Sequence, residues 1–392
     1  MDDTRILHAA LFTPGIGHVW GLPLMVIGPP GSAKTAKIVQ TTKAVALHTE
    51  ILISSLRDPT DFMGMPYVTT ISKKEDVVGV RYSPPDWALR AQKAGRACVF
   101  MDETNTAPPS VQAALLRVVH ERCAGECQLG GGVRVLGARN SVEDAAGGYE
   151  LAPPLANRFG HIHWEGPDVK AWSAYILSAG NGNEVQAITT AEDEENRVLG
   201  LWPNEYATGA GIITSFLRRK PSLLHQQPAS GSPASSEAWP SRRTWEMAIR
   251  ALASSKVQKL SEDEADRFVG SFVGAAAMRE LRTWMAELDL PDPSELLDGK
   301  CKFVADKDRL DRTMVVLSSC AALVAPESAE KRPERAAACW KLVLQHMETA
   351  DVCYPAVSTL SSKEVRLVDR QNPDSMKVLA KFHPILVASG AI

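Results

Sequence analysis

Residues 28–35, GPPGSAKT, place two glycines ahead of an adjacent lysine and threonine, directly after a short apolar run. Gly28 and Gly31 allow a tight turn, so that successive backbone N–H groups can surround the β- and γ-phosphates of a nucleotide. Lys34 adds a positive charge for those phosphates, and the Thr35 hydroxyl is a suitable ligand for Mg²⁺. The spacing predicts a phosphate-binding loop formed by Gly28, Pro29, Pro30, Gly31, Ser32, Ala33, Lys34 and Thr35.

Two carboxylates end a second apolar run, ACVFMDET, further along the chain. We expect Asp102 to hold Mg²⁺ through water, as the acidic partner of Thr35. Because side chains alternate along a strand, Glu103 is expected to point away from Asp102 and to polarise the water that attacks the γ-phosphate. The alternative interpretation of such a pair is a solvated strand end.

Asn140 and Arg158 are the next candidates for chemistry. Asn140 follows an expected strand and can orient the attacking water between Glu103 and the γ-phosphate; an ordinary asparagine in a glycine-rich turn is the alternative. Arg158 precedes the last expected strand, and a nucleotide at a subunit boundary could receive its guanidinium from the neighbouring protomer. A solvated surface arginine is the alternative for Arg158.

The elements that must position these residues alternate over the first 165 residues. Apolar runs predict strands at 24–27, 51–53, 98–101, 133–136 and 161–164, and helical patterns lie between them, at 34–48 and 110–121 for example. Such alternation predicts an α/β fold in which helices cover both faces of a mostly parallel sheet.

From about residue 167 onward the pattern is helical. Helices are expected at 169–179, 208–219, 243–255, 262–288, 310–324 and 335–350. The stretch 226–240 is rich in Pro, Ser, Ala and Gln and is expected to be an exposed loop. Residues 289–299 mark a second boundary, before a C-terminal helical extension.

Composition excludes some classes of function. The 392 residues carry a net charge of −3, so no overall basic field would recruit nucleic acid or an acidic membrane. Seven cysteines, an odd number scattered over the chain, favour reduced thiols, and Cys123 and Cys127 lack a second pair at zinc-ligand spacing. We found no signal peptide and no apolar run long enough to span a bilayer, and therefore expect a cytoplasmic protein without membrane insertion.

The ordered set of motifs resembles the AAA+ ATPases: residues 28–35 as Walker A, Asp102 and Glu103 as Walker B, Asn140 as sensor 1 and Arg158 as the arginine finger. Three segments, 58–68, 102–122 and 138–159, are similar to the MoxR branch. The resemblance implies that ATP and Mg²⁺ are the cofactors. It also implies a P-loop core, a three-layer αβα structure, followed by an α-helical lid.

The resemblance further implies three domains. Residues 1–166 would form the core, with a helix-2 insert hairpin near 65–83; residues 167–290 the lid; and residues 291–392 the helical extension. A shorter hairpin is expected at 122–133, and such hairpins carry substrate contacts in ring-forming relatives. Sensor 2 matches Arg243, with Arg242 in the place of the usual proline. The choice between these two arginines stays open, as does whether the arginine serves its own nucleotide or a neighbour's.

The function that the resemblance implies is ATP hydrolysis by a homo-oligomeric ring, expected to be a hexamer, that remodels or matures a partner protein. MoxR-like ATPases typically work with a von Willebrand factor A domain protein. Two other functions stay open: a nucleotide-dependent assembly switch with little turnover, and a nucleic-acid motor. The acidic net charge counts against the motor.

Ala33 stands where the general loop motif has its last glycine. MoxR-like loops commonly have Ala-Lys at this point. We expect position 33 to lie in helical conformation at the start of the next helix, where Ala is favoured over Gly by about 1 kcal/mol.

Overall fold

The computed structural model describes residues 3–17, 19–72, 77–141, 144, 148–179, 187–229, 231–287, 290–306, 309–325, 332–361, 367 and 372–388. The chain divides into two compact units, Met1–Leu199 with His225–Ala275, and Gly200–Leu224 with Ala276–Ile392. The first unit thus joins the expected core to part of the expected lid. The division into domains at 166 and 290 stays a prediction.

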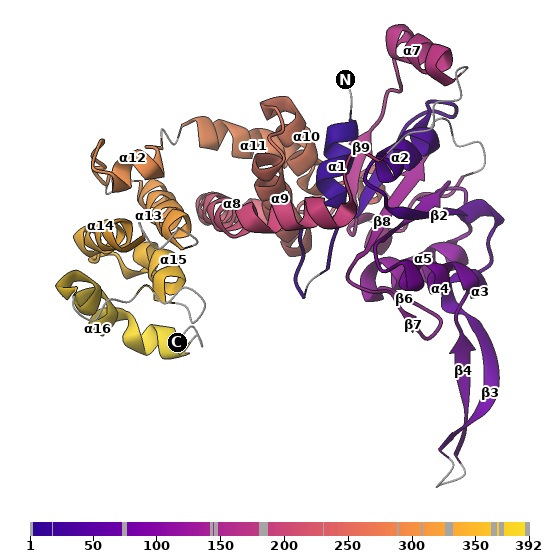
Figure 1. Ribbon diagram of the computed structural model, residues 1–392, viewed down its shortest axis with the longest axis horizontal. Coiled ribbons are helices and arrows are strands. Elements are labelled where there is room, and N and C mark those ends of the chain that lie inside the picture. The colour runs from indigo at the N-terminus through magenta and orange to yellow at the C-terminus, as the bar shows by residue number, and fades with distance from the viewer. Residues whose placement is uncertain are drawn as a thin grey trace. The chain divides into compact units, whose positions relative to one another are not determined.

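The first unit is built on five parallel strands in the order β2-β5-β8-β1-β9. They are β1 (Leu24–Ile27), β2 (His48–Ile53), β5 (Ala97–Asp102), β8 (Val133–Arg139) and β9 (Gly160–His163). Figure 1 shows this sheet with helices around it, and β2, β8 and β9 are labelled. All five expected strands are confirmed, as is the α/β fold class. Because β1 lies between β8 and β9, the loop that follows β1 leaves the carboxyl edge of the sheet with a strand end on either side of it. In open α/β sheets this edge is where ligands bind.

Helices cover both faces of the sheet. Met25, Val99 and Val135 pack on one face in a core that includes side chains of four helices. These helices are α3 (Thr60–Met63), α4 (Asp86–Ala94), α5 (Pro109–Glu121) and α6 (Pro153–Ala156). On the opposite face, α10 (Glu262–Val273) packs against β9. There α1 (Thr4–Leu11) contacts α10, α2 (Lys34–Lys43) and α9 (Arg242–Val257).

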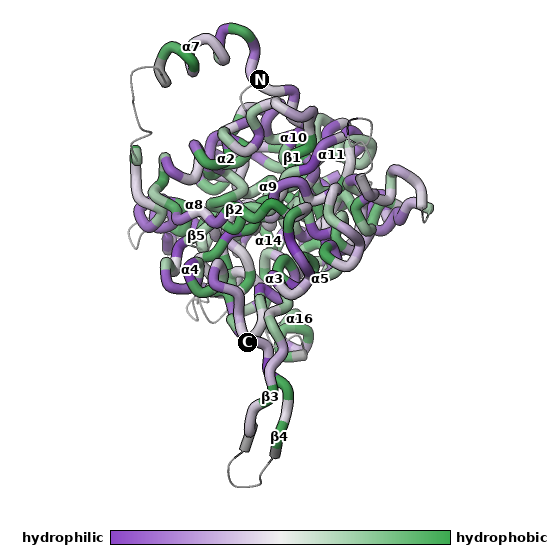
Figure 2. Tube along the Cα trace, turned by 90° about the vertical axis from the view of Figure 1, so that its right-hand side faces the viewer, coloured by the Kyte–Doolittle hydropathy of each residue, from purple (hydrophilic) through white to green (hydrophobic). Residues whose placement is uncertain are grey.

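Two hairpins extend from this unit, as expected from the sequence. The first pairs β3 (Met65–Ser72) with β4 (Val77–Ser83), and residues 73–76 of its turn lie outside the described residues. The second pairs β6 (Cys123–Ala124) with β7 (Cys127–Gln128). The β3–β4 hairpin projects away from the sheet and carries hydrophobic stretches (Figure 2). Val68 and Val78, on the same face of the hairpin, are 72% and 63% exposed.

Several expected helix bounds were wrong. Helix α2 ends at Lys43, and His48 already begins β2. The expected helix 262–288 is divided into α10 and α11 (Ala275–Ala286) by Gly274, whose φ of +83° ends α10. A side chain at Gly274 would meet the Ala238 carbonyl oxygen at 2.8 Å, so the break has a packing reason. The expected helix 208–219 is the end of a longer one, α8 (Ala191–Arg219), whereas α7 (Val169–Ala179) was predicted correctly.

The stretch 226–240 is not simply an exposed loop. It contains a 3₁₀ turn, η3 (Pro233–Ser236), and Ser235, Ser236 and Trp239 are buried. The Ser236 hydroxyl donates a 2.9 Å hydrogen bond to the carbonyl of Leu151. The polar composition suggested exposure, but small hydroxyl side chains can be buried when backbone acceptors receive their protons.

The second unit is helical and has its own apolar core, with Trp340, Leu317 and Phe382 among its fully buried residues. Besides part of α8 and α11, its helices are α12 (Pro293–Leu297), α13 (Leu310–Val324), α14 (Arg332–Gln345), α15 (Ala350–Ser361) and α16 (Pro373–Ala388). Two further 3₁₀ turns are η1 (Ser54–Leu56), in the first unit, and η2 (Pro221–Leu224), in the second. Among the described residues, none of the helices combines the length and apolarity needed to cross a bilayer.

Candidate functional site

The loop between β1 and α2 surrounds the head group of Lys34. The Lys34 Nζ donates hydrogen bonds to the carbonyls of Gly28 and Pro29, both at 2.8 Å, and to Asn140 Oδ1 at 3.1 Å. Burial lowers the pKa of Lys34, and the carboxylates of Asp102, Asp144 and Glu103 partly offset this effect. The loop therefore holds one positive charge beside the carboxyl edge of the sheet.

Backbone conformation corrects the expectation for Ala33, and close packing explains Gly28. Ala33 is not helical: its φ of +64° and ψ of +22° are left-handed, and α2 begins one residue later. This conformation costs an L-residue roughly 1–2 kcal/mol, so the general preference for Gly at this position has a steric reason. At Gly28 a Cβ would lie 2.4 Å from the Trp164 carbonyl oxygen, which excludes any side chain.

Thr35 and Asp102 lie together, as expected from the sequence. The Thr35 hydroxyl donates a 2.5 Å hydrogen bond to Asp102 Oδ2. A hydroxyl next to a carboxylate is an all-oxygen donor set, which fits Mg²⁺. No group of three or more His, Cys, Asp or Glu side chains among the described residues could hold a metal alone. The protein's share of a magnesium site would therefore be these two side chains beside the phosphates.

Contrary to expectation, the orientation of Glu103 is not set by strand alternation, because Glu103 lies outside the strand. Strand β5 ends at Asp102, and Glu103 follows it with a left-handed φ of +53°. The Asp102 carboxylate accepts the Glu103 backbone N–H at 2.9 Å, while the Glu103 carboxylate accepts a 2.6 Å hydrogen bond from the Ser55 hydroxyl. Ser55 was not predicted from the sequence. It follows β2, and because β2 pairs with β5 in parallel, Ser55 lies at the same carboxyl edge of the sheet as Glu103.

Asn140 accepts a hydrogen bond from Lys34, and its backbone is fixed by a second asparagine. Asn105 Nδ2 donates to the Asn140 carbonyl at 3.1 Å, and the Asn140 N–H donates to Asn105 Oδ1 at 3.2 Å. Asn105 is 2% exposed. Asn105 was not predicted from the sequence, although it stands only two positions after Glu103.

Arg158 and Arg243 form a second group of site residues. Arg243 donates to Asn157 Oδ1 at 3.3 Å, and the Ser241 hydroxyl donates to the same oxygen at 3.0 Å. Arg158 donates to the Pro154 carbonyl at 2.6 Å. Burial lowers the pKa of Arg158, and the charge of Arg243 lowers it further. The structure thus brings the two arginines near each other.

This pair is separate from the phosphate loop. Within the part of the chain that the structure describes, neither Arg158 nor Arg243 has a hydrogen bond or ion pair to residues 28–35, Asp102, Glu103 or Asn140. The pair therefore lies outside the hydrogen-bonded group around Lys34.

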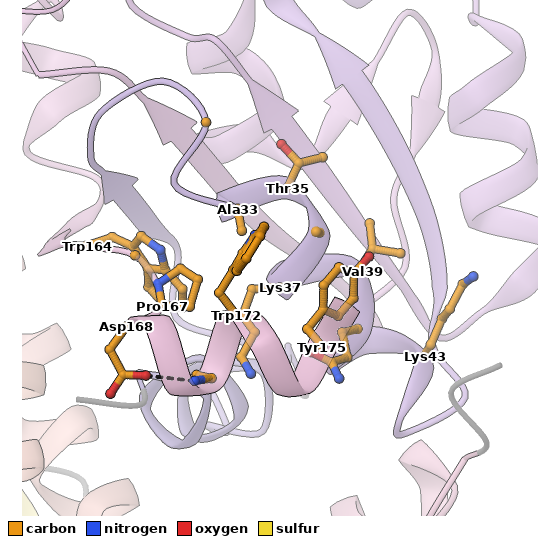
Figure 3. A pocket seen from close by; sticks show the side chains of 15 residues that line it. Ala33, Thr35, Lys37, Val39, Lys43, Trp164, Pro167, Asp168, Trp172 and Tyr175 are labelled. Atoms are coloured by element: carbon orange, nitrogen blue, oxygen red, sulfur yellow. Dashed lines mark hydrogen bonds between the residues drawn. The ribbon is translucent and has the colours of Figure 1, made fainter. Parts of the chain in front are cut away.

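A cavity of about 670 Å³ adjoins the phosphate loop and extends along α2 to α7 (Figure 3). Trp164, Trp172 and Tyr175 contribute aromatic rings to its lining. The Trp164 indole N–H donates a 2.8 Å hydrogen bond to the Ser32 carbonyl, so this ring is fixed to the loop. Trp172, by contrast, is 54% exposed. None of the three residues was predicted from the sequence, although Trp172 and Tyr175 have the i,i+3 spacing that places side chains on one helix face.

The comparisons with known proteins do not name a family. Neither a family model nor a curated protein matches this chain. Among solved structures, the chain is similar to a protein from Cytophaga hutchinsonii described as a "putative ATPase", with 16% sequence identity and a TM-score of 0.47. The similarity covers 74% of this chain and 89% of the other. A likeness at this level decides neither family nor activity, so a functional proposal must rest on the geometry of the site.

Proposed function

We propose that this chain is an ATPase of the AAA+ type, in the MoxR branch. The observation that carries the proposal is the set of groups around one loop: Lys34 bonded to Asn140, and Thr35 bonded to Asp102. A surface turn would need neither the buried lysine nor the adjacent oxygen donors. Together these groups match the needs of phosphoryl transfer, which are positioned positive charge, a metal site and an oriented nucleophile.

The chain's own residues divide the work of hydrolysis. Backbone N–H groups of the loop and the Lys34 ammonium orient the β- and γ-phosphates, and Thr35 with Asp102 would hold Mg²⁺. Mg²⁺, when bound, would neutralise part of the negative charge of the phosphates. Glu103 accepts a proton from the attacking water, whose oxygen bonds to the γ-phosphorus as the bond to the β-phosphate oxygen breaks, giving ADP and phosphate. Asn140 orients that water.

The aromatic cavity supports a nucleotide rather than phosphate alone as the ligand. It continues from Gly31 and Thr35 in the phosphate loop to Trp172 and Tyr175. Aromatic rings accept the flat face of a nucleobase by stacking. We infer that the base of ATP lies in this cavity.

We further propose that the active form is a homo-oligomeric ring, with Arg158 and Arg243 directed at a neighbour's nucleotide. The lack of any hydrogen bond or ion pair, among the described residues, between these arginines and the phosphate loop supports the proposal. Such a ring, a hexamer in our proposal, would use hydrolysis to remodel a partner, with a von Willebrand factor A domain protein as the proposed partner class. The projecting β3–β4 hairpin, with its exposed valines, is the proposed substrate contact.

The test is ATP turnover by the purified chain, compared with two variants. Glu103→Gln should retain ATP binding and lose about 10²–10⁴-fold in turnover, because the proton acceptor is removed. Lys34→Ala should lose both binding and turnover. If the wild type turned over ATP no faster than both variants, the proposed ATPase activity would be refuted.

One observation favours a second candidate, a nucleotide-dependent assembly switch. The Glu103 carboxylate accepts a hydrogen bond from Ser55 at Oε2, which makes it a weaker proton acceptor and holds its position. The switch would give ATP-dependent oligomers, measured by light scattering, without turnover. Turnover that rises in Ser55→Ala would favour the ATPase.

A further inference from the structure

The carboxylate of Glu237 contacts the two strands that flank β1. The sheet register aligns Ile27, the last residue of β1, with Arg139 of β8 and with His163 of β9. Residues aligned across parallel strands point to the same face. Arg139, Ile27 and His163 therefore form a row directly before the phosphate loop, and Glu237 contacts both ends of that row.

The contacts define a Glu237 cluster of Glu237, Arg139, His161 and His163. Glu237 Oε1 forms an ion pair with Arg139, which is 1% exposed. Glu237 Oε2 lies 3.7 Å from His161 Nδ1 and 3.7 Å from His163 Nε2. Burial alone would raise the pKa of Glu237, but the neighbouring His163 imidazole and the charge of Arg139 lower it to about 2. The carboxylate is thus ionised at neutral pH.

Each end of the row is one residue away from a group that shapes the site. Arg139 precedes Asn140, which accepts the hydrogen bond from Lys34. His163 precedes Trp164, whose carbonyl packs on Gly28 and whose indole donates to Ser32. A shift of either strand end would therefore move the phosphate loop or the residue that orients the water.

Glu237 also lies close in sequence to the second group of site residues. Four positions later, Ser241 caps helix α9 and donates to Asn157. Arg243 follows in the first turn of that helix and contacts the same Asn157 oxygen. The segment that contacts the sheet beneath the phosphate loop thus continues directly into the segment that carries Arg243.

We propose that Glu237 is a positioning residue that keeps Asn140 and the phosphate loop in place relative to the helix that carries Arg243. The proposal rests on the proposed ATPase function. Within the described residues Glu237 forms no hydrogen bond or ion pair with residues 28–35, Asp102, Glu103 or Asn140. We therefore expect its effect on hydrolysis to pass mainly through Arg139 to Asn140.

The test compares Glu237→Gln with a matched control on the same strand. At the start of β8, Arg134 is 0% exposed in its side chain and forms an ion pair with Glu195. Glu195→Gln, like Glu237→Gln, leaves a buried arginine without its carboxylate, but at the end of the strand away from the site. Misplacement of catalytic groups by about 1 Å can cost about 10²-fold in rate. We expect Glu237→Gln to lower kcat by about that factor with KM nearly unchanged, and Glu195→Gln to leave kcat of the folded protein unchanged.

A double-mutant cycle shows whether the effect passes through Asn140. In an Asn140→Ala background, Glu237→Gln should lower kcat by less than about threefold, because the residue it positions is already gone. Equal losses in both backgrounds would overturn the proposal, as would equal losses from Glu237→Gln and Glu195→Gln. Glu237→Asp, which keeps the charge, should recover most of the turnover.

Two further measurements cover poor folding and absent turnover. If Glu237→Gln does not fold, the double variant Arg139→Met, Glu237→Met removes the buried charge together with its partner, and it should fold and still turn over slowly. Wild-type turnover in that variant would overturn the proposal.

Amide hydrogen exchange tests the positioning without any need for ATP hydrolysis. It should quicken at Asn140, whose N–H is bonded to Asn105, in Glu237→Gln and not in Glu195→Gln. If the wild type hydrolyses no ATP, the ATPase proposal fails while the exchange still tests the positioning; unchanged exchange would refute it.

Discussion

At the scale of single residues, Ala33 carries a measurable cost. Its left-handed backbone disfavours an L-residue by roughly 1–2 kcal/mol, whereas a glycine there would add about 0.4–1 kcal/mol of unfolded-state entropy. The difference predicts that Ala33→Gly raises the free energy of unfolding by about 0.5–1 kcal/mol, measured by urea denaturation. Ala36→Gly is the control: Ala36 is helical, so this variant should lower the free energy of unfolding by about 1 kcal/mol. Equal losses in both variants would contradict the left-handed conformation.

Some site residues could be predicted from the sequence and others could not. Lys34, Thr35 and Asp102 follow from spacing, because a loop between a strand and a helix fixes its own geometry. Ser55 and Asn105 do not, because their contacts depend on which strands are neighbours in the sheet. Strand alternation could not predict the orientation of Glu103, because Glu103 lies beyond the end of β5 with a positive φ, which a glutamate rarely adopts and the sequence does not reveal.

At the scale of elements, α7 and the segment before it complete the aromatic cavity. Trp172→Ala should weaken ATP binding by about tenfold, because stacking on a base is worth about 1–3 kcal/mol. Tripolyphosphate, which has no base, should bind the variant and the wild type equally. Both affinities can be measured by calorimetry.

Leu177→Ala is the control for this prediction. Leu177 lies on the same helix and is 74% exposed, but it does not line the cavity. If Trp172→Ala weakened the binding of tripolyphosphate as much as the binding of ATP, the inference that the cavity holds the base would be wrong.

Helix boundaries show why the sequence could not predict all elements. Residues 262–288 keep a helical apolar pattern across Gly274, and only the nearby Ala238 carbonyl shows why the chain turns there. The stretch 226–240 has the composition of a surface loop, yet its Glu237 lies against Arg139, nearly a hundred residues earlier. Both contacts join segments that are far apart in sequence, so no local pattern could predict them.

At the scale of the whole molecule, the proposed ring predicts that two inactive variants restore each other. Arg158→Ala keeps an intact phosphate loop, and Lys34→Ala keeps an intact Arg158. If each site combines a loop from one chain with Arg158 from the next, random mixing restores about one quarter of the sites. ATP turnover of the 1:1 mixture measures this.

The same mixture distinguishes a shared site from one within a single chain. A site built within one chain would gain nothing from mixing, and the proposed role of Arg158 would then be wrong. Mixing two samples of Arg158→Ala controls for the effect of protein concentration.

The β3–β4 hairpin leaves and rejoins the first unit at nearly one point. Met65 pairs with Ser83, and a Cβ on Gly64 would lie 2.5 Å from the Ser83 carbonyl oxygen. An insertion with such closely spaced ends can change length without moving the elements on either side, because the entropy of closing a loop grows slowly with its length. The hairpin is therefore an insertion whose length can vary independently of the sheet. If it is the proposed substrate contact, shortening it, lengthening it or replacing it with another peptide should change the bound partner and leave the proposed ATP turnover unchanged.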